Sequence, residues 1–152
     1  MRLAARSTGF ELVMQAEFAA SREAVFAAWT DRRLIARWWA AKTYTTLSCE
    51  MDVRPGGAWR RLLRRSDGTL LIEYGTYREV VPPQRLVFTY NSEGGDPVEP
   101  ETVVAVTLAR LSDGRTRLTL RHSGIETDAA RAIHEAGWSR CLGRFSTTLP
   151  EG

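Results

Sequence analysis

The sequence has few of the residues that most often carry metal, redox or disulfide chemistry. It contains two histidines and two cysteines among 152 residues. Cys49 and Cys141 stand far apart, without the paired spacing of a zinc motif, so they predict reduced, buried thiols and no disulfide framework. The sequence also has no glycine-rich phosphate loop, no Walker-type lysine and no Gly-x-Ser-x-Gly motif. We therefore expect no metal and no cofactor.

Long hydrophobic runs are absent as well. No apolar run approaches the ~20 residues that a membrane-spanning helix requires, and residues 1–9 lack the apolar segment of a secretory signal. The hydrophobic fraction of 43% and the charged fraction of 26% are typical of a soluble globular protein. We predict a single domain over residues 10–150 after a flexible tail at 1–9, no membrane partner and a cytoplasmic location.

The sequence has no large excess of charge. The formal net charge is +3, and Lys42 is the only lysine. A basic cluster on one stretch could bind phosphate, but no interleaved aromatic residues or nucleic-acid-binding motif accompany it. We predict a solvated strand face there and no nucleic-acid partner. The cluster consists of Arg60, Arg61, Arg64 and Arg65.

What the sequence does contain is a long C-terminal helix, predicted over residues 128–149. Thr127 or Asp128 can cap its start, and Pro150 cannot continue it. Apolar or bulky side chains recur along it at steps of three and four, which predicts one buried face. That face carries His134, Trp138, Cys141, Leu142, Phe145 and Leu149.

Most of the remaining chain has the pattern of strands. Apolar and polar residues alternate over 10–18, which predicts a half-buried first strand. Ser21 and Asp31 can cap two short helices that follow it. Tight turns, such as Asp67-Gly68 and Asp113-Gly114, join most of the later strands. We predict the first of these strands from residue 46 to the turn at 52–57. The others are predicted over residues 58–65, 69–81, 85–91, 102–111 and 115–122, and residues 92–100 are predicted to form an exposed, mobile loop.

Such short connections require antiparallel pairing, because parallel strands need a crossover of a dozen or more residues. The predicted class is α+β: a curved antiparallel sheet of about seven strands wrapped around the C-terminal helix, with two short helices between strands one and two. The long helix must cover one face of the sheet, and an internal cavity is expected between them. Strand 69–81 is ambiguous, because its apolar residues leave either face plausible as the inner one.

The two histidines are candidates for a site in that cavity. His122 is in phase with Leu118 and Leu120, so it points to the covered face of the sheet. His134 lies on the buried face of the helix, and both can line the same end of the cavity. They can be hydrogen-bonded core residues or polar groups that contact a ligand; catalysis and metal binding are the remaining alternatives.

Arg61 shares a strand face with Trp59, so it can meet an anionic ligand group if that face is covered. The favoured alternative is an ion pair with Glu73 or Glu79 at the sheet rim. Tryptophans 38 and 39 are adjacent on a short helix and cannot point the same way, so one should reach solvent or a cavity mouth.

Four runs of residues resemble the START-like helix-grip superfamily (SRPBCC) and, within it, the family named for the activator of the ninety-kilodalton heat-shock-protein ATPase. The resemblance covers residues 10–149. It implies a deep cavity for lipids, hormones or polyketides, which some members use for cyclisation or hydrolysis. The runs are Trp29-Thr30-Asp31 with Trp38-Trp39, residues 52–59, residues 75–89 and residues 134–138. The side chains implied to lie near the cavity are Trp39, Trp59, Tyr77, His122, His134 and Trp138.

These observations leave three functions open. The first is the binding of a small, mainly hydrophobic molecule; the second is an enzyme of cyclase, dehydratase or hydrolase type with a histidine as general base. The third is a chaperone-associated or other protein-interaction module whose interior is filled by its own side chains. We expect no added domain of the eukaryotic chaperone-activator kind, and homodimerisation stays open. The predicted ligand-binding residues are Trp39, Trp59, Arg61, Tyr77, His122, His134 and Trp138.

Overall fold

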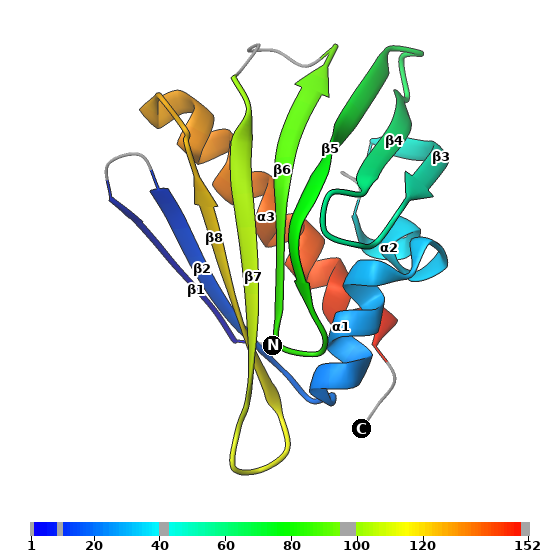
Figure 1. Ribbon diagram of the computed structural model, residues 1–152. Coiled ribbons are helices and arrows are strands. Elements are labelled where there is room, and N and C mark those ends of the chain that lie inside the picture. Colours follow the sequence, from blue (N-terminus) through cyan, green and yellow to red (C-terminus); the bar gives the residue numbers. More distant parts are fainter. Residues whose placement is uncertain (1, 9–10, 40–42, 95–99, 150–152) are drawn as a thin grey trace.

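The computed structural model describes residues 2–8, 11–39, 43–94 and 100–149. Eight strands form one antiparallel sheet in the order β1-β2-β8-β7-β6-β5-β4-β3 (Figure 1). The strands are β1 (Arg2–Thr8), β2 (Glu11–Phe18), β3 (Tyr44–Met51), β4 (Ala58–Arg65), β5 (Leu70–Val81), β6 (Arg85–Glu93), β7 (Thr102–Arg110) and β8 (Thr116–Ser123). The helices are α1 (Arg22–Thr30), α2 (Arg32–Trp38) and α3 (Asp128–Thr148).

The three helices lie on the same side of the sheet. In Figure 1, α3 crosses diagonally behind the strands, and α1 and α2 lie beside its C-terminal part. The predicted caps are confirmed: Ser21 Oγ accepts from the Ala24 N–H at 3.2 Å, and Thr127 Oγ1 accepts from the Ala130 N–H at 3.1 Å. Asp31 caps α2 in the same way. Local capping therefore sets where each helix begins.

Alternation along the strands sends one set of side chains toward the helices. Leu118, Leu120 and His122 on β8 are all fully buried, as the pattern predicted. On β5 the structure resolves the ambiguity of the sequence. Tyr77 points inward, and a register shift after it changes the phase, so Val80 again packs against the core. Because the inward-facing positions change within the strand, neither of the two possible alternation patterns fits the whole segment.

The first residues of the chain differ from the prediction. Residues 1–9 were expected to be a flexible tail, but β1 pairs antiparallel with β2 from Arg2 opposite Glu17 to Thr8 opposite Glu11. β1 is held by backbone hydrogen bonds at the edge of the sheet, and such pairing needs no strong side-chain alternation. The predicted α+β class, with a curved sheet, two short helices and a long C-terminal helix, is confirmed; β1 adds the eighth strand.

Three further observations bear on the sequence predictions. Both cysteines are free; Cys141 is buried and Cys49 is half-buried. None of the described helices combines the length and the apolar character needed to cross a bilayer. The predicted mobile loop at 92–100 lies largely outside the described residues.

Candidate functional site

Aromatic side chains occupy the space between α3 and the sheet. Trp29 lies at the centre, with its ring 4.5 Å from that of Trp38 and 5.9 Å from that of Trp138. Phe145 on α3 is fully buried and packs 4.9 Å from Phe18 on β2. These contacts stabilise the helix against the sheet, and they fill the region in which the sequence predicted a deep cavity.

A small cavity lies instead beneath α1 and α2, against β3 to β6. Its volume is about 10 Å³, room for roughly one water-sized group. Four of the seven predicted site residues line it, whereas His122, His134 and Trp138 lie in a separate cluster. Met51 is the one lining side chain that is only half-buried. The lining consists of Trp29, Ile35, Trp39, Met51, Trp59, Arg61, Tyr77, Leu86 and Phe88.

Arg61 is the charged member of this cavity wall and is only 1% exposed. Its Nη1 lies 3.2 Å from Glu73 Oε1, so the predicted ion pair forms with Glu73. The pair is buried and does not lie at the rim, because both residues face the helices. The other rim candidate, Glu79, contacts Arg85 on the exposed surface. A buried pair of this kind requires further hydrogen bonds to be tolerated.

Those further bonds come from three elements: the end of α2, β3 and β6. Arg61 Nη2 donates to the carbonyl oxygen of Trp39 and, at 3.4 Å, to Thr46 Oγ1. Glu73 accepts a hydrogen bond from the Tyr90 hydroxyl. The guanidinium carbon also lies 5.0 Å from the centre of the Trp39 ring, within the range of a cation–π contact. The network ties β3, β4, β5 and β6 to the end of α2.

One donor of the arginine remains outside this network. Arg61 Nε is buried and has no hydrogen-bond partner. Cys49 pairs with Arg61 across the strands, and burial raises the pKa of its thiol against the opposing effect of the arginine charge. Burial likewise raises the pKa of Tyr77, on the cavity wall. The wall thus consists of neutral groups around one neutralised cation.

The two histidines form the second cluster, at the far end of α3. His122 is fully buried; its Nδ1 accepts from Trp138 Nε1 at 3.1 Å, and its Nε2 lies 2.8 Å from Thr102 Oγ1. Thr102 Oγ1 donates to the carbonyl oxygen of Tyr90 at 3.3 Å, so it accepts from His122 Nε2–H. This arrangement selects the neutral Nε2–H tautomer. Burial, and then the neighbouring His134, lower the pKa of His122 to about 3.

His134 is brought next to His122, as the sequence predicted. Their ring centres are 4.3 Å apart, and the Tyr90 ring lies 5.9 Å from His134. Both nitrogens of His122 are engaged, so its contacts match the hydrogen-bonded core alternative. A general base must contact a reacting proton, and neither histidine lines the cavity. The described residues also contain no group of three or more His, Cys, Asp or Glu side chains arranged to hold a metal ion.

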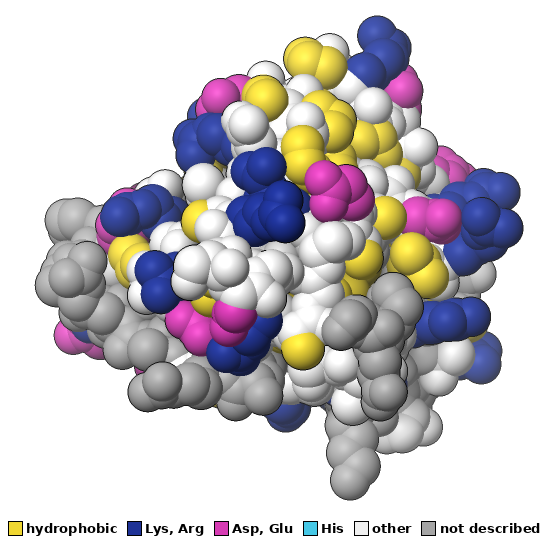
Figure 2. Space-filling view, turned by 90° about the horizontal axis from the view of Figure 1, so that it is seen from below, with side chains coloured by type: hydrophobic (Ala, Val, Ile, Leu, Met, Phe, Trp, Pro, Cys, Tyr) yellow, Lys and Arg dark blue, Asp and Glu magenta, His cyan; other side chains and the backbone are white. Residues whose placement is uncertain are grey.

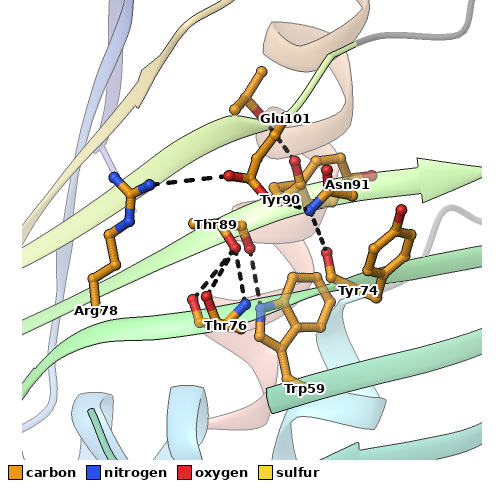
Figure 3. Close-up of polar contacts among 9 residues, drawn as sticks. Trp59, Tyr74, Thr76, Arg78, Thr89, Tyr90, Asn91 and Glu101 are labelled. Carbon is orange, nitrogen blue, oxygen red and sulfur yellow. Dashed lines mark hydrogen bonds and ion pairs between the residues drawn. The ribbon is translucent and has the colours of Figure 1, made fainter. Parts of the chain in front are cut away.

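A larger depression, which the sequence did not reveal, lies on the opposite, outer face of the sheet. Its volume is about 510 Å³. Asn91 at its centre donates to the Tyr74 carbonyl oxygen at 3.4 Å and to Glu101 Oε2 at 3.0 Å (Figure 3). We call it the outer groove; it is lined by Ala58, Trp59, Arg60, Ile72, Tyr74, Gly75, Thr76, Thr89, Asn91, Glu93 and Glu101.

Gly75 forms the floor of the outer groove. A Cβ there would lie 1.9 Å from the Thr89 carbonyl oxygen and 2.7 Å from Trp59 Nε1. Because Gly75 has no side chain, the Trp59 indole has room to donate a hydrogen bond to the Thr89 carbonyl oxygen at 3.1 Å (Figure 3). Trp59 therefore lines both the inner cavity and the outer groove.

The predicted basic cluster is divided between the two faces. Arg61 is buried, whereas Arg60 and Arg64 are exposed on the outer face. On the described part of the surface in Figure 2, Arg side chains are interspersed with Asp, Glu and small hydrophobic patches. The described residues on this face form no continuous basic stripe of the kind that nucleic-acid binding favours.

Comparisons with protein families and with solved structures identify proteins that are similar to this chain. The family model AHSA1, described as activator of Hsp90 ATPase homolog 1-like protein, matches residues 19–150. No curated protein sequence matches this chain.

Solved structures are similar along nearly the whole chain. A protein from Chromobacterium violaceum has a TM-score of 0.80 at 24% identity, covering 91% of this chain and 96% of its own. The AHSA1 protein from Silicibacter pomeroyi has a TM-score of 0.79 at 25% identity, with 90% and 95% covered. A protein from Arthrobacter aurescens has a TM-score of 0.81 at 25% identity, with 98% and 92% covered.

Proposed function

Because the chain belongs to the AHSA1 family and has the START-like helix-grip fold, we propose that it binds a small, mainly hydrophobic molecule in the cavity beneath α2. Proteins of this fold generally bind hydrophobic ligands. The observation that carries the proposal is an apolar, aromatic cavity wall that gathers Trp39, Trp59, Arg61 and Tyr77 at one place. Apolar walls with a few oriented polar groups are typical of small-molecule sites.

The cavity must enlarge to take a ligand, since ligand pockets usually measure roughly 300–1,000 Å³. Met51 offers the simplest route. It is half-buried on β3, opposite Trp59, and methionine side chains adapt readily to a new neighbour. Ile35, on α2, is a second aliphatic side chain of the wall. We expect movement of these two side chains to enlarge the cavity, and the Arg61 network uses neither of them.

The test is thermal unfolding of the protein with a panel of fatty acids, aromatic polyketides, sterols and flavonoids. A ligand at about a hundred times its dissociation constant adds roughly 2.7 kcal/mol to the unfolding free energy, a shift of a few degrees. Met51→Ala enlarges the cavity and should retain or increase that shift. Leu47→Ala, an exposed aliphatic on the same strand that does not line the cavity, should leave it unchanged. A panel in which no compound shifts either protein would contradict the proposal.

A second candidate is a protein-interaction module, favoured by the aromatic packing that fills the space between α3 and the sheet. The outer groove then supplies the contact surface, with Tyr74 and Arg60 exposed in it. The test is the ATPase rate of a purified ninety-kilodalton heat-shock protein with and without this protein. This candidate is supported if the protein stimulates the ATPase, if Tyr74→Ala abolishes the stimulation, and if Arg110→Ala, outside the groove, leaves it intact. An unchanged ATPase rate contradicts it.

A further inference from the structure

The wall of the cavity beneath α2 carries one buried donor that the protein does not use. The Nη1 and Nη2 groups of Arg61 are engaged by Glu73, Trp39 and Thr46, whereas Nε–H has no hydrogen-bond partner. The thiol of Cys49 contributes at most a weak hydrogen bond to the guanidinium, because sulfur is a weak acceptor. A buried donor without a partner lowers the stability of the folded protein. A ligand whose acceptor atom forms a hydrogen bond with this donor removes that penalty, and this contributes to the binding free energy.

The charge around this donor selects the kind of acceptor. Glu73 already neutralises Arg61, and the Tyr90 hydroxyl donates to the same carboxylate. A ligand carboxylate would add a second negative charge beside Glu73 in a region of low polarity, which is unfavourable. A hydrocarbon would leave the Nε–H unsatisfied. A neutral oxygen, such as that of a ketone, satisfies the donor without changing the net charge.

The other side chains of the cavity wall determine which kind of molecule carries this oxygen. Trp39, Trp59 and Phe88 present their rings around the cavity, with centres 5.6 Å to 5.7 Å apart in each pair. Rings in tilted or edge-to-face contact at such distances favour another flat apolar group among them. Arg61 lies 5.0 Å from the Trp39 ring, so its side chain is held next to that surface.

We propose that this cavity selects uncharged aromatic compounds that carry a carbonyl or similar neutral oxygen, and that this oxygen accepts a hydrogen bond from Arg61 Nε–H. The inference rests on the proposed function, because it names the ligand class of the same cavity. It differs from the simpler expectation that a buried arginine binds an anion. Arg61 acts here as a positioning donor whose charge is already balanced.

The experiment compares three small probes that share one ring: acetophenone, ethylbenzene and benzoate. Their affinities are measured by titration in ¹H–¹⁵N NMR, following the tryptophan indole signals and the Arg61 Nε–H signal, which Arg61→Lys identifies by its loss. Acetophenone should bind about tenfold more tightly than ethylbenzene, the value expected for one added hydrogen bond to a charged donor. Benzoate should bind most weakly, and only acetophenone should move the Nε–H proton downfield.

Three variants separate the contributions. Arg61→Lys keeps the positive charge for Glu73 but has no Nε–H, so acetophenone should lose its tenfold advantage. Arg64→Lys makes the same change on the exposed outer face of β4 and should keep that advantage. Glu73→Gln leaves Arg61 without its counter-charge, so the preference should change from acetophenone to benzoate.

The outcomes distinguish this inference from the function on which it rests. If none of the three probes perturbs the indole signals of Trp39 and Trp59, the proposed binding function of the cavity is wrong. If the probes bind but benzoate is tightest, or acetophenone and ethylbenzene bind equally, ligand binding stands and the selection of a neutral acceptor is overturned. The comparison among probes uses the native protein, so it holds even where a variant is unstable.

Discussion

At the scale of single residues, the buried pair of Arg61 and Glu73 is the feature on which the candidate site depends. Strand alternation turns both side chains toward the helices, where a lone charge would be strongly unfavourable. The pair therefore stabilises the fold only while both members are present. Its network of bonds also holds the guanidinium against Trp39.

Removing the carboxylate charge of Glu73 should therefore destabilise the folded protein. We expect Glu73→Gln to lower the unfolding free energy by about 3 kcal/mol, because Arg61 then remains buried with an unbalanced charge. Glu79→Gln breaks a pair with Arg85 whose side chains are 40% and 49% exposed, so it should cost less than about 1 kcal/mol. Urea unfolding measures both. Equal losses in the two variants would mean that burial of the pair does not matter.

At the scale of elements, β5 is an irregular strand whose residues line both the inner cavity and the outer groove. Gly75 lets the Trp59 indole bond to the Thr89 carbonyl across the strand, and the register shift follows two residues later. The absence of one Cβ thus leaves room for Trp59, which lines both the inner cavity and the outer groove. The glycine is required here by close approach of atoms, and its backbone conformation is ordinary.

Two glycine substitutions should therefore have opposite effects. Gly75→Ala places a Cβ 1.9 Å from the Thr89 carbonyl oxygen, so β5 and β6 must separate, and we expect a loss of about 3 kcal/mol. Gly137→Ala in α3 meets no atom within 4 Å, and its higher helix propensity should add up to about 1 kcal/mol. Thermal unfolding of both variants checks the signs; a neutral Gly75→Ala would contradict the close contact.

At the scale of the whole molecule, His122 joins the helix layer to the sheet. Its two ring nitrogens connect Trp138 on α3 to Thr102 on β7, and the ring itself belongs to β8. The bond from Trp138 requires a neutral imidazole, because a protonated Nδ1 cannot accept a hydrogen bond. Protonation of this one ring is therefore coupled to the packing of α3 on the sheet.

This coupling predicts a fall in stability with acid. His122 has a pKa of about 3 in the folded protein and near 6.5 when unfolded, so between these values the unfolded chain binds the extra proton. The contribution is complete above about pH 6.5 and is lost as the pH falls toward about 3. Between about pH 7 and pH 5 it amounts to about 2 kcal/mol.

Urea unfolding of the native protein and of His122→Gln at both pH values measures the effect. Glutamine keeps one donor and one acceptor but does not titrate, so the variant should lack this part of the pH dependence. The difference between the two proteins removes the contribution of the carboxylates they share. Identical pH dependence in the two proteins would show that His122 is not held neutral by its surroundings.

The sequence by itself determined the features that depend on local backbone geometry. Alternation placed His122 on the covered face and Arg61 on the same strand face as Trp59, helical spacing placed Trp138 on the covered side, and capping residues marked the start of each helix. These features were predictable because a residue's direction follows from its neighbours along one element. The antiparallel order of the strands followed from short turns for the same reason.

Only the tertiary structure decided what depends on several elements at once. The cavity is small and lies beneath α2 because side chains from α1, α3 and the sheet together fill the remaining space. Glu73 became the partner of Arg61 because β4 and β5 pair with these two residues opposite each other, and β1 exists because β2 offers it a backbone edge. Distances between elements follow from packing of the whole interior, which no local period encodes.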